Sequence, residues 1–337
     1  MSSYPRLDIA LASGGLTLPE GRIAVLGPRA GAPLDALPKD RTEVITGFFP
    51  DHQYFERQGL TCRTVPEGRY DLVLVLLPRA KALARAWIAQ ASEICDGVIA
   101  VDGTKDAGIE SVLRDCRKRA EVSGPVNKAH GKLFWFEGGD FADWAAGPQV
   151  LEQGFHTAPG VFSADGIDPA SALLGASLPE KLGSRVIDLG GGWGYLTAQV
   201  LTRAGVAHVD LVEADHAALA CARLNLTDPR VSFHWADATA WSPQTRADAV
   251  VMNPPFHTER KADPELGRAF IRKAAASLSP RGTLWMVANR HLPYEPVLAE
   301  CFAEHEEIAG TGAFKVIRAA APRGPGASRQ LRRKPRS

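Results

Sequence analysis

A short loop, Asn253-Pro254-Pro255-Phe256, follows an apolar run that ends at Met252. The Asn253 side-chain carbonyl and the Pro254 backbone carbonyl can accept the two N–H bonds of an exocyclic amino group. The prolines stiffen the loop, so both acceptors are in place before a substrate arrives. Phe256 offers a flat face on which an extruded base can stack. The predicted catalytic residues are Asn253, Pro254, Pro255 and Phe256, with His257 as a candidate proton relay.

A glycine-rich turn follows another apolar run, Arg185–Leu189. Its glycines, Gly190, Gly192 and Gly194, are spaced G-x-G-x-G, whereas a dinucleotide-binding turn has G-x-G-x-x-G. Asp188 precedes them, and its carboxylate would repel a pyrophosphate but attract a cationic ligand. S-adenosylmethionine carries a sulfonium and an ammonium group and no phosphate. The turn therefore predicts a site for this methyl donor, which would act on the amine held by the Asn253 loop, and Asn253 is itself also a predicted cofactor-binding residue.

Two further acids follow the next two predicted strands, His208–Val212 and Val231–Trp235. Glu213 can accept hydrogen bonds from both ribose hydroxyls, and Asp237 from the adenine amino group, with the Ala238 backbone N–H near the ring. A strand-end acid is more often a turn former or a helix cap, so each one alone is weak evidence. Three acids that end consecutive strands favour one ligand site, at the carboxyl edge of a parallel sheet.

The elements that must position these loops occur twice along the chain. In the second half, the apolar run Ala249–Met252 precedes a helical stretch, 266–278, and another apolar run, 283–288. Residues 72–101 repeat this order with similar spacing. Continuous apolar runs that alternate with helices are typical of a parallel sheet covered on both faces. Residues 306–317 read as an antiparallel hairpin with glycines at its turn.

The pattern predicts an α/β protein of two tandem Rossmann-like domains, residues 1–148 and 149–318, the second closed by an antiparallel hairpin. Glycine and proline interrupt the pattern between Phe141 and Gly154, where we place the boundary. Seven cations and no acid lie between Arg318 and Ser337, which leaves −6 on the rest of a chain whose net charge is +1. Residues 319–337 are predicted to form a basic disordered tail, which is either an RNA contact or a solvated terminus.

Composition excludes several classes of protein. The 337 residues are 45% hydrophobic and 23% charged, and no apolar run approaches the ~20 residues that span a bilayer. The N-terminus lacks the features of a signal peptide, so a cytoplasmic protein with no membrane contact is expected. The five cysteines are scattered and form no C-x-x-C pair, which argues against a disulfide framework and against a metal site.

At these residues the chain resembles class I methyltransferases, and more narrowly the bacterial ribosomal RNA guanine-N2 methyltransferases with two tandem methyltransferase-like domains. In that family, a segment like Pro159-Gly160-Val161-Phe162-Ser163, with an Asp beyond it, packs beside the cofactor. The resemblance therefore implies that Phe162 and Asp168 belong to the cofactor site. A loop and helix cap built on Asp165 or Asp168 is the alternative. The resemblance rests on residues 188–194, Glu213, Asp237, residues 253–257 and this segment.

The resemblance also implies a first domain that has lost cofactor binding and assists folding or RNA recognition. In agreement, the turn after Leu26 lacks the spaced glycines, and the run 76–79 lacks the amide. The implied reaction transfers a methyl group from S-adenosylmethionine to N2 of a guanine in ribosomal RNA, with small-subunit RNA favoured, and the enzyme is expected to be a monomer. The candidate phosphate contacts of the first domain are Lys39, Arg41, Arg79 and Lys81.

Two other functions stay open at this point. One is an N-methyltransferase that acts on a protein glutamine or a small amine, because an amide nitrogen has the same delocalised lone pair. The other is a non-enzymatic RNA-binding assembly factor with a relict site. The methyl-transfer reading depends on one geometric prediction: the loop around residue 190 and the loop around residue 254 share one rim of the sheet.

Overall fold

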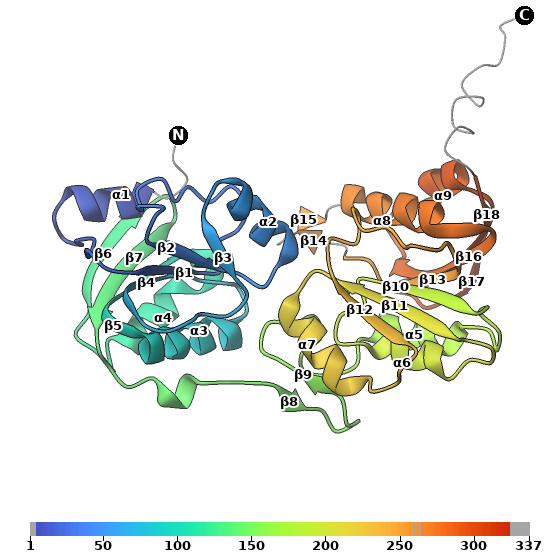
Figure 1. The fold of residues 1–337 in the computed structure, drawn as a ribbon, viewed down its shortest axis with the longest axis horizontal. Helices are drawn as coiled ribbons and strands as arrows, with labels where there is room; N and C mark the ends of the chain where they lie inside the picture. Colours follow the sequence, from blue (N-terminus) through green and yellow to red (C-terminus); the bar gives the residue numbers. More distant parts are fainter. Residues whose placement is uncertain (1–4, 256, 259–260, 263, 324–337) are drawn as a thin grey trace, which may run out of the picture. The chain divides into compact units, whose positions relative to one another are not determined.

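The computed structural model describes residues 5–255, 257–258, 261–262 and 264–323. The chain forms two compact units, Met1–Gln149 with Ala158–Gly160, and Val150–Thr157 with Val161–Ser337. Each unit contains a seven-stranded, mostly parallel sheet with helices on its faces (Figure 1). The predicted fold class is therefore confirmed.

The first unit has the strand order β3-β2-β1-β4-β5-β7-β6. Its last two strands form an antiparallel hairpin that the sequence analysis did not predict. The reason is that β6 is largely exposed and so has no apolar run to reveal it. Its elements are α1 (Pro5–Ala12), β1 (Ile23–Leu26), β2 (Thr42–Ile45), α2 (Phe49–Arg57), β3 (Thr61–Arg63), β4 (Tyr70–Leu76), α3 (Lys81–Ile94), β5 (Cys95–Thr104), α4 (Ile109–Cys116), β6 (Ser123–Lys128) and β7 (Gly131–Glu137).

The second unit repeats this arrangement, with the order β12-β11-β10-β13-β16-β18-β17. The predicted hairpin is present as β17 and β18. The two-stranded pair β14 and β15, which follows the predicted catalytic loop, was not expected. The elements from residue 149 onward are β8 (Gln149–Val150), β9 (His156–Thr157), α5 (Pro169–Ser177), β10 (Arg185–Leu189), α6 (Tyr195–Leu201), β11 (His208–Glu213), α7 (His216–Asn225), β12 (Val231–Trp235), β13 (Ala247–Met252), β14 (His257–Thr258), β15 (Lys261–Ala262), α8 (Pro264–Ser277), β16 (Leu278–Asn289), α9 (Glu295–Cys301), β17 (Phe302–Gly310) and β18 (Phe314–Pro322).

Alternate residues of β10 bury on opposite faces of the second sheet. Ile187 packs in a core with Phe270 of α8. Val186 faces the other way and packs with Leu174 of α5 and Val200 of α6. Helices cover both faces of this sheet (Figure 1), which explains why the strand reads as a continuous apolar run. The packing fixes the carboxyl ends of β10, β11 and β13 at one edge, where the predicted site residues lie.

The first strands of the two units end in the same kind of turn. In the second unit, the Gly190 N–H donates to the carbonyl of Val212 across 2.8 Å. In the first unit, the Gly27 N–H donates to the carbonyl of Ile45 across 2.9 Å. Both glycines have positive φ angles, 74° and 70°. The strand frame around the glycine turn is therefore common to both units.

The space at the two turns differs. Two residues before the glycine, the second unit has Asp188 and the first has Val25, and both are fully buried. A Cβ atom added to Gly27 would lie 2.1 Å from the ring of Trp87, so this indole occupies the space over the turn. The first unit thus lacks the carboxylate that the second unit has at this place, and its turn is covered more tightly, because a Cβ atom on the equivalent Gly190 would lie 3.3 Å from the ring of Phe270.

The boundary predicted between the second domain and the tail was wrong. Residues 319–322 lie in β18, where Ala319 is fully buried. Arg318 forms an ion pair with Glu306 across 3.1 Å, and the Arg323 guanidinium donates to the Phe302 carbonyl across 3.0 Å. Two of the seven cations between Arg318 and Ser337 therefore contact the folded hairpin. Residues 324–337, with the other cations, lie outside the described part of the chain.

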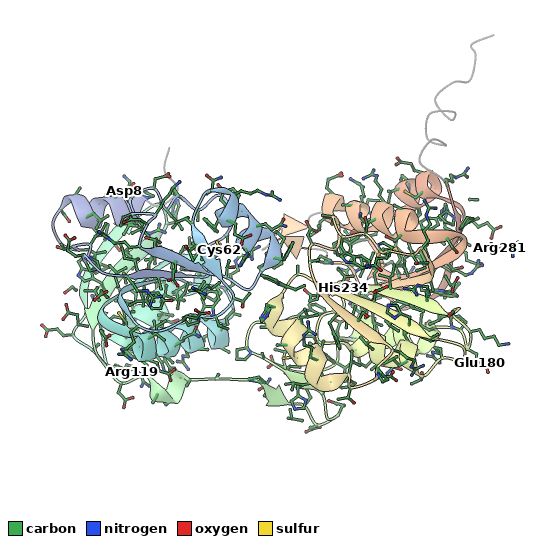
Figure 2. The ribbon with its side chains drawn as sticks, in the orientation of Figure 1. Asp8, Cys62, Arg119, Glu180, His234 and Arg281 are labelled. Atoms are coloured by element: carbon green, nitrogen blue, oxygen red, sulfur yellow. The ribbon has the colours of Figure 1, made fainter. Side chains whose placement is uncertain are left out.

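Side chains fill the space between each sheet and its helices, whereas Glu180 and Arg281 project from the periphery of the second unit (Figure 2). None of the helices in the described ranges combines the length and the apolar character needed to cross a bilayer.

Candidate active site

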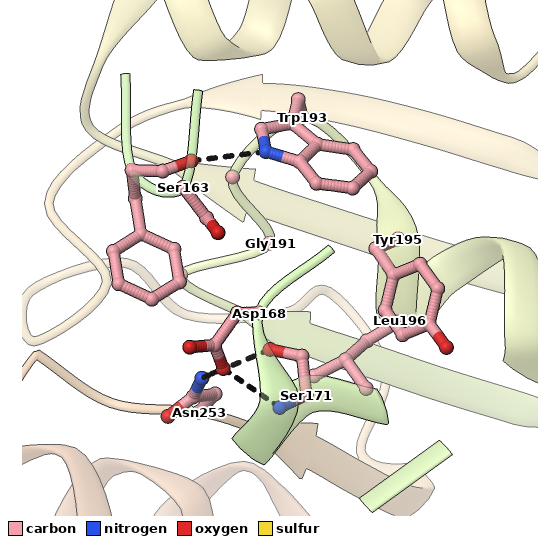
Figure 3. Close-up of a pocket in the computed structure, with 11 residues that line it drawn as sticks. Ser163, Asp168, Ser171, Gly191, Trp193, Tyr195, Leu196 and Asn253 are labelled. Carbon is pink, nitrogen blue, oxygen red and sulfur yellow. Dashed lines mark hydrogen bonds between the residues drawn. The ribbon is translucent and has the colours of Figure 1, made fainter. Parts of the chain in front are cut away.

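One cavity at the carboxyl edge of the second sheet contains both predicted loops (Figure 3). Gly190 and Gly192 line it from the glycine turn, and Asn253 lines it from the end of β13. This arrangement confirms the prediction that the two loops share one rim. The lining residues are Phe162, Ser163, Asp168, Ser171, Gly190, Gly191, Gly192, Trp193, Tyr195, Leu196 and Asn253.

The backbone of the glycine turn explains its residue types. Gly190, Gly192 and Gly194 all have positive φ angles, 74°, 55° and 94°, which other residues adopt only with strain. A Cβ on Gly194 would also lie 2.6 Å from the Leu226 side chain. At Gly192, in contrast, a Cβ would meet no atom within 4 Å. The turn is therefore closely packed at its helix end and open toward the cavity at Gly192.

Asp188 lies beneath this turn and is fully buried. The Thr197 hydroxyl donates to Asp188 Oδ2 across 2.7 Å, but the other oxygen, Oδ1, has no hydrogen-bond partner among the described residues. The pKa of this carboxyl is raised to about 7. Burial is the largest cause and the charge of Glu213 adds to it, while the hydrogen bond from Thr197 opposes the shift. A buried oxygen without a donor is unfavourable. Asp188 is not among the residues that line the cavity, so its contact with a cationic ligand stays a prediction.

Glu213 ends β11 and is held by two backbone groups. Its Oε2 accepts from the Gly192 N–H and its Oε1 from the Asp215 N–H, each across 2.8 Å. The pKa of Glu213 is raised to about 7. Burial is the largest cause and the charge of Asp215 adds to it, while these N–H bonds oppose the shift. Glu213 therefore fixes the open part of the glycine turn. Each of its oxygens keeps a second lone pair that can accept a hydrogen bond from a ribose hydroxyl. Ribose binding stays a prediction.

The structure does not bring Asp237 and Ala238 to the lining of the cavity. Asp237 Oδ1 accepts from the Thr239 N–H across 2.8 Å and from the Thr239 hydroxyl across 2.6 Å. The Ala238 side chain is buried in the core of the sheet. Asp237 thus has the turn-forming role that strand-end acids often have, and its contact with adenine remains a prediction.

Hydrogen bonds join the segment around Phe162 to the glycine turn. The Trp193 indole N–H donates to the Phe162 carbonyl across 2.9 Å. The Asn225 amide donates to the carbonyls of Trp193 and His156 across 2.8 Å and 2.9 Å. The Phe162 side chain is 62% exposed and lines the cavity. An exposed aromatic ring on an anchored backbone is thereby placed at the rim.

Asn253 is held by two residues of the segment that precedes the sheet. Its Nδ2 donates to Asp168 Oδ2 and to the Ser171 hydroxyl, each across 2.9 Å (Figure 3). Asp168 Oδ2 also accepts from the Ser171 N–H across 2.8 Å, as the N-cap of α5. Asn253 Oδ1 is buried and has no hydrogen-bond partner in the described part of the chain. Asn253 thus lines the cavity and has one unsatisfied, buried acceptor atom.

The rest of the predicted catalytic loop is only partly described. Pro254 is buried and Pro255 is exposed. Phe256 lies outside the described residues, as does the side chain of His257, whose backbone is in β14. The stacking role of Phe256 and the proton relay by His257 therefore stay predictions.

Sequence reasoning missed several lining residues, among them Ser171, Trp193 and Tyr195. The spacing Asp168-x-x-Ser171 is a helix-cap signal and could have identified Ser171. Nothing in the sequence marked Trp193 as an anchor.

The candidate phosphate contacts all lie in the first unit. Lys39 donates to the Gln58 carbonyl, and Arg41 is 3.9 Å from Glu20. Arg79 follows β4, and Lys81 begins α3.

Comparisons with known proteins agree with this geometry. Residues 152–318 match the family model of the methyltransferase small domain. The ribosomal RNA small subunit methyltransferase C of Cronobacter sakazakii is 32% identical over 219 residues, which cover 62% of this chain and 64% of that protein. The protein of the same name from Psychromonas ingrahamii is 29% identical over 298 residues, which cover 80% and 84%. In the Cronobacter protein, the matched part is therefore less than two thirds of the relative's length.

A solved structure matches nearly the whole chain. It is the T. thermophilus 16S rRNA N2 G1207 methyltransferase in complex with AdoMet and guanosine. The TM-score is 0.77 at 28% sequence identity, and the match covers 94% of this chain and 91% of that one. Fold, cavity and comparisons lead to one conclusion: the second unit of the chain contains a methyltransferase small domain, in a two-unit fold similar to that of the T. thermophilus 16S rRNA methyltransferase.

Proposed function

We propose that this protein transfers a methyl group from S-adenosylmethionine to the exocyclic N2 amine of a guanine in small-subunit ribosomal RNA. The observation that carries the proposal is the buried, unpartnered Oδ1 of Asn253, in the same cavity as the glycine turn. The similarity to a 16S rRNA N2 methyltransferase over nearly the whole chain supports the same substrate class.

The residues around the glycine turn fit S-adenosylmethionine. Asp188 Oδ1 is a buried acceptor without a donor, and the space at Gly192 is open. The acids at the ends of β10 and β11 disfavour a phosphate-bearing ligand. We infer that Asp188, Gly190, Gly192 and Glu213 hold the cofactor, which supplies a methyl group already activated by a sulfonium. Gly194 is proposed to shape the turn. Asp237 and Ala238 are proposed to contact the adenine of the cofactor.

The catalytic loop would act through positioning and electrostatics. An exocyclic amine is a poor nucleophile because its lone pair is delocalised into the base. Asn253 Oδ1 and the Pro254 carbonyl would accept its two N–H bonds, which directs the lone pair toward the methyl group. The nitrogen becomes acidic once it is methylated, so a strong general base is unnecessary. The guanine must leave its stack to reach these acceptors, and Phe256 is the proposed stacking surface.

The first unit is proposed to assist folding or RNA recognition and to bind no cofactor. This proposal is supported by Val25, which stands where the second unit has the Asp188 carboxylate, and by Trp87, which covers its glycine turn more tightly than Phe270 covers Gly190. All described lining residues of the cavity come from one unit, which supports action as a monomer. A ribosomal substrate would place the reaction in the cytoplasm.

The deciding experiment incubates the purified protein with labelled S-adenosylmethionine and small ribosomal subunits from cells that lack the gene. The proposal expects one methyl group on N2 of one guanine, located by mass mapping of the 16S RNA. Purified release-factor protein, offered in parallel, tests the glutamine alternative. Label only in the protein would refute the proposed substrate, and absence of cofactor binding by calorimetry would refute an enzymatic role.

A pair of glycine substitutions should separate ligand binding from folding. Gly192→Ala places a methyl group in open space, so it should weaken S-adenosylmethionine binding by roughly tenfold and lower the free energy of unfolding by only about 1 kcal/mol. Gly194→Ala adds a clash with Leu226 to the same kind of strain, so it should cost about 2–3 kcal/mol. Calorimetric titration and denaturant unfolding measure the two effects. Equal stability losses in the two variants would contradict this assignment.

A further inference from the structure

Asp168 contacts the catalytic amide in this structure. The Asp168 carboxylate accepts a hydrogen bond from Asn253, which is 85 positions away in the sequence and is the proposed substrate-binding residue. It and the Ser171 hydroxyl accept hydrogen bonds from the same nitrogen, Asn253 Nδ2. That nitrogen has two hydrogens, so both can be engaged at once. The only amide atom left without a partner in the described ranges is Oδ1.

We propose that Asp168 is a positioning residue that fixes the orientation of the Asn253 amide, so that Oδ1 rather than Nδ2 is offered to the substrate amine. This inference rests on the proposed function and adds to it a residue that acts through Asn253. It assigns Asp168 to the substrate side of the cavity, whereas the family resemblance implied the cofactor side.

The orientation matters because the two ends of a carboxamide have nearly the same shape and opposite hydrogen-bonding character. With Oδ1 toward the cavity, the amide accepts from the N2 amine. With Nδ2 toward the cavity, donor would face donor and the amine could not be held. Rotation of the amide by half a turn would therefore abolish its proposed action without changing the shape of the site.

Charge decides between these two orientations. An ionised carboxylate only accepts hydrogen bonds, so Asp168 attracts Nδ2 and repels Oδ1. Ser171 can donate or accept, so its hydroxyl alone would tolerate either orientation. Asp168 is thus the group that discriminates, and Ser171 completes the bond to the second hydrogen.

The protein holds Asp168 itself in a fixed place. Its Oδ2 caps α5 by accepting from the Ser171 N–H across 2.8 Å. The same helix buries Ala170 and Leu174 in the core against the sheet that carries Asn253. A carboxylate fixed in this way can orient the amide before any substrate binds, which is the arrangement that catalysis by positioning requires.

The decisive variant is Asp168→Asn. Asparagine is as good an N-cap as aspartate, so α5 and the free energy of unfolding should be retained. The new amide can donate to Asn253 Oδ1, so the orientation is no longer enforced. We expect kcat on small ribosomal subunits to fall by roughly tenfold or more, with the Kd for S-adenosylmethionine changed by less than about twofold. Ser171→Ala, the matched control, keeps the carboxylate and should lose only about threefold.

A double-mutant cycle tests whether Asp168 acts through Asn253. In a protein that already carries Asn253→Ala, the further change Asp168→Asn should have no effect on kcat, because no amide remains to be oriented. Independent, additive losses would overturn the proposal. So would a fall in cofactor affinity equal to the fall in turnover, since that result would assign Asp168 to cofactor binding.

A second readout does not need the substrate. In a nitrogen-15 spectrum, the Asn253 side-chain amide signals, identified by their loss in Asn253→Ala, should show slow hydrogen exchange in the wild type and faster exchange in Asp168→Asn. Unchanged exchange would refute the positioning role. If the wild type methylated no RNA while the amide signals responded as expected, the proposed function would fail and the orienting contact would stand.

Discussion

Replacing Asn253 by alanine is expected to lower kcat by roughly a hundredfold or more while the Kd for S-adenosylmethionine stays within about twofold. The substitution removes Oδ1, the buried acceptor proposed to hold the N2 amine, and leaves the glycine turn and Asp188 intact. Single-turnover methylation of small ribosomal subunits measures the first quantity, and calorimetric titration measures the second.

Gln244→Ala provides a matched control for this experiment. Gln244 is an exposed carboxamide that precedes the amino end of β13, whereas Asn253 follows the carboxyl end of the same strand. Its removal should leave both quantities unchanged. If Asn253→Ala weakened cofactor binding as much as it slowed turnover, Asn253 would be a cofactor ligand and its proposed role would be wrong.

The affinity for S-adenosylmethionine is expected to rise by about threefold to tenfold between about pH 6 and pH 8. The pKa values of Asp188 and Glu213 are both raised to about 7, so both carboxyls ionise across this interval and then attract a cationic ligand. Asp188→Asn should weaken binding by more than roughly tenfold at pH 8 and flatten the pH dependence. S-adenosylhomocysteine, which lacks the sulfonium charge, should show a shallower dependence on the wild type.

The same carboxyls set the sign of the pH dependence of stability. Their folded pKa values lie above the ordinary values of 3.8 and 4.5, so the folded state binds more protons than the unfolded state. The free energy of unfolding of the ligand-free protein should therefore fall as pH rises from about 4 to about 7, and then level off. Asp188→Asn should reduce this fall, as measured by denaturant unfolding at each pH. A wild-type stability that increased over that interval would contradict the assignment.

The sheet could be predicted because its strands are buried on both faces. The ranges Arg185–Leu189 and Val231–Trp235 coincide with β10 and β12, and each begins directly after a polar residue. The missed strands of the two large sheets are β3 and β6, which are short or exposed, and β7, which is buried. Residue types alone therefore reveal most strands that carry an apolar run, including the edge strand β12, and leave edge strands without such a run unmarked.

The candidate site could be predicted only in part, because long-range contacts determine which atoms are available. The glycine turn and Asn253 were placed correctly, since both follow central strands whose carboxyl ends meet at one edge. The orientation of the Asn253 amide depends on Asp168, which no local pattern links to it. Glu213 was predicted as a ribose ligand, yet its oxygens also hold the Gly192 and Asp215 N–H groups, which the sequence did not indicate.

The presence of Val25 in the first unit, where the second has Asp188, has a consequence for any compound that mimics the methyl donor. Although the chain contains two sheets of the same topology, such an inhibitor should saturate at a stoichiometry of one molecule per polypeptide. Shortening Trp87 would open space beside Gly27 without creating a second receptor, because Val25 stands where the second unit has the Asp188 carboxylate. The chain therefore has two domains of similar fold but only one expected binding site for such an inhibitor.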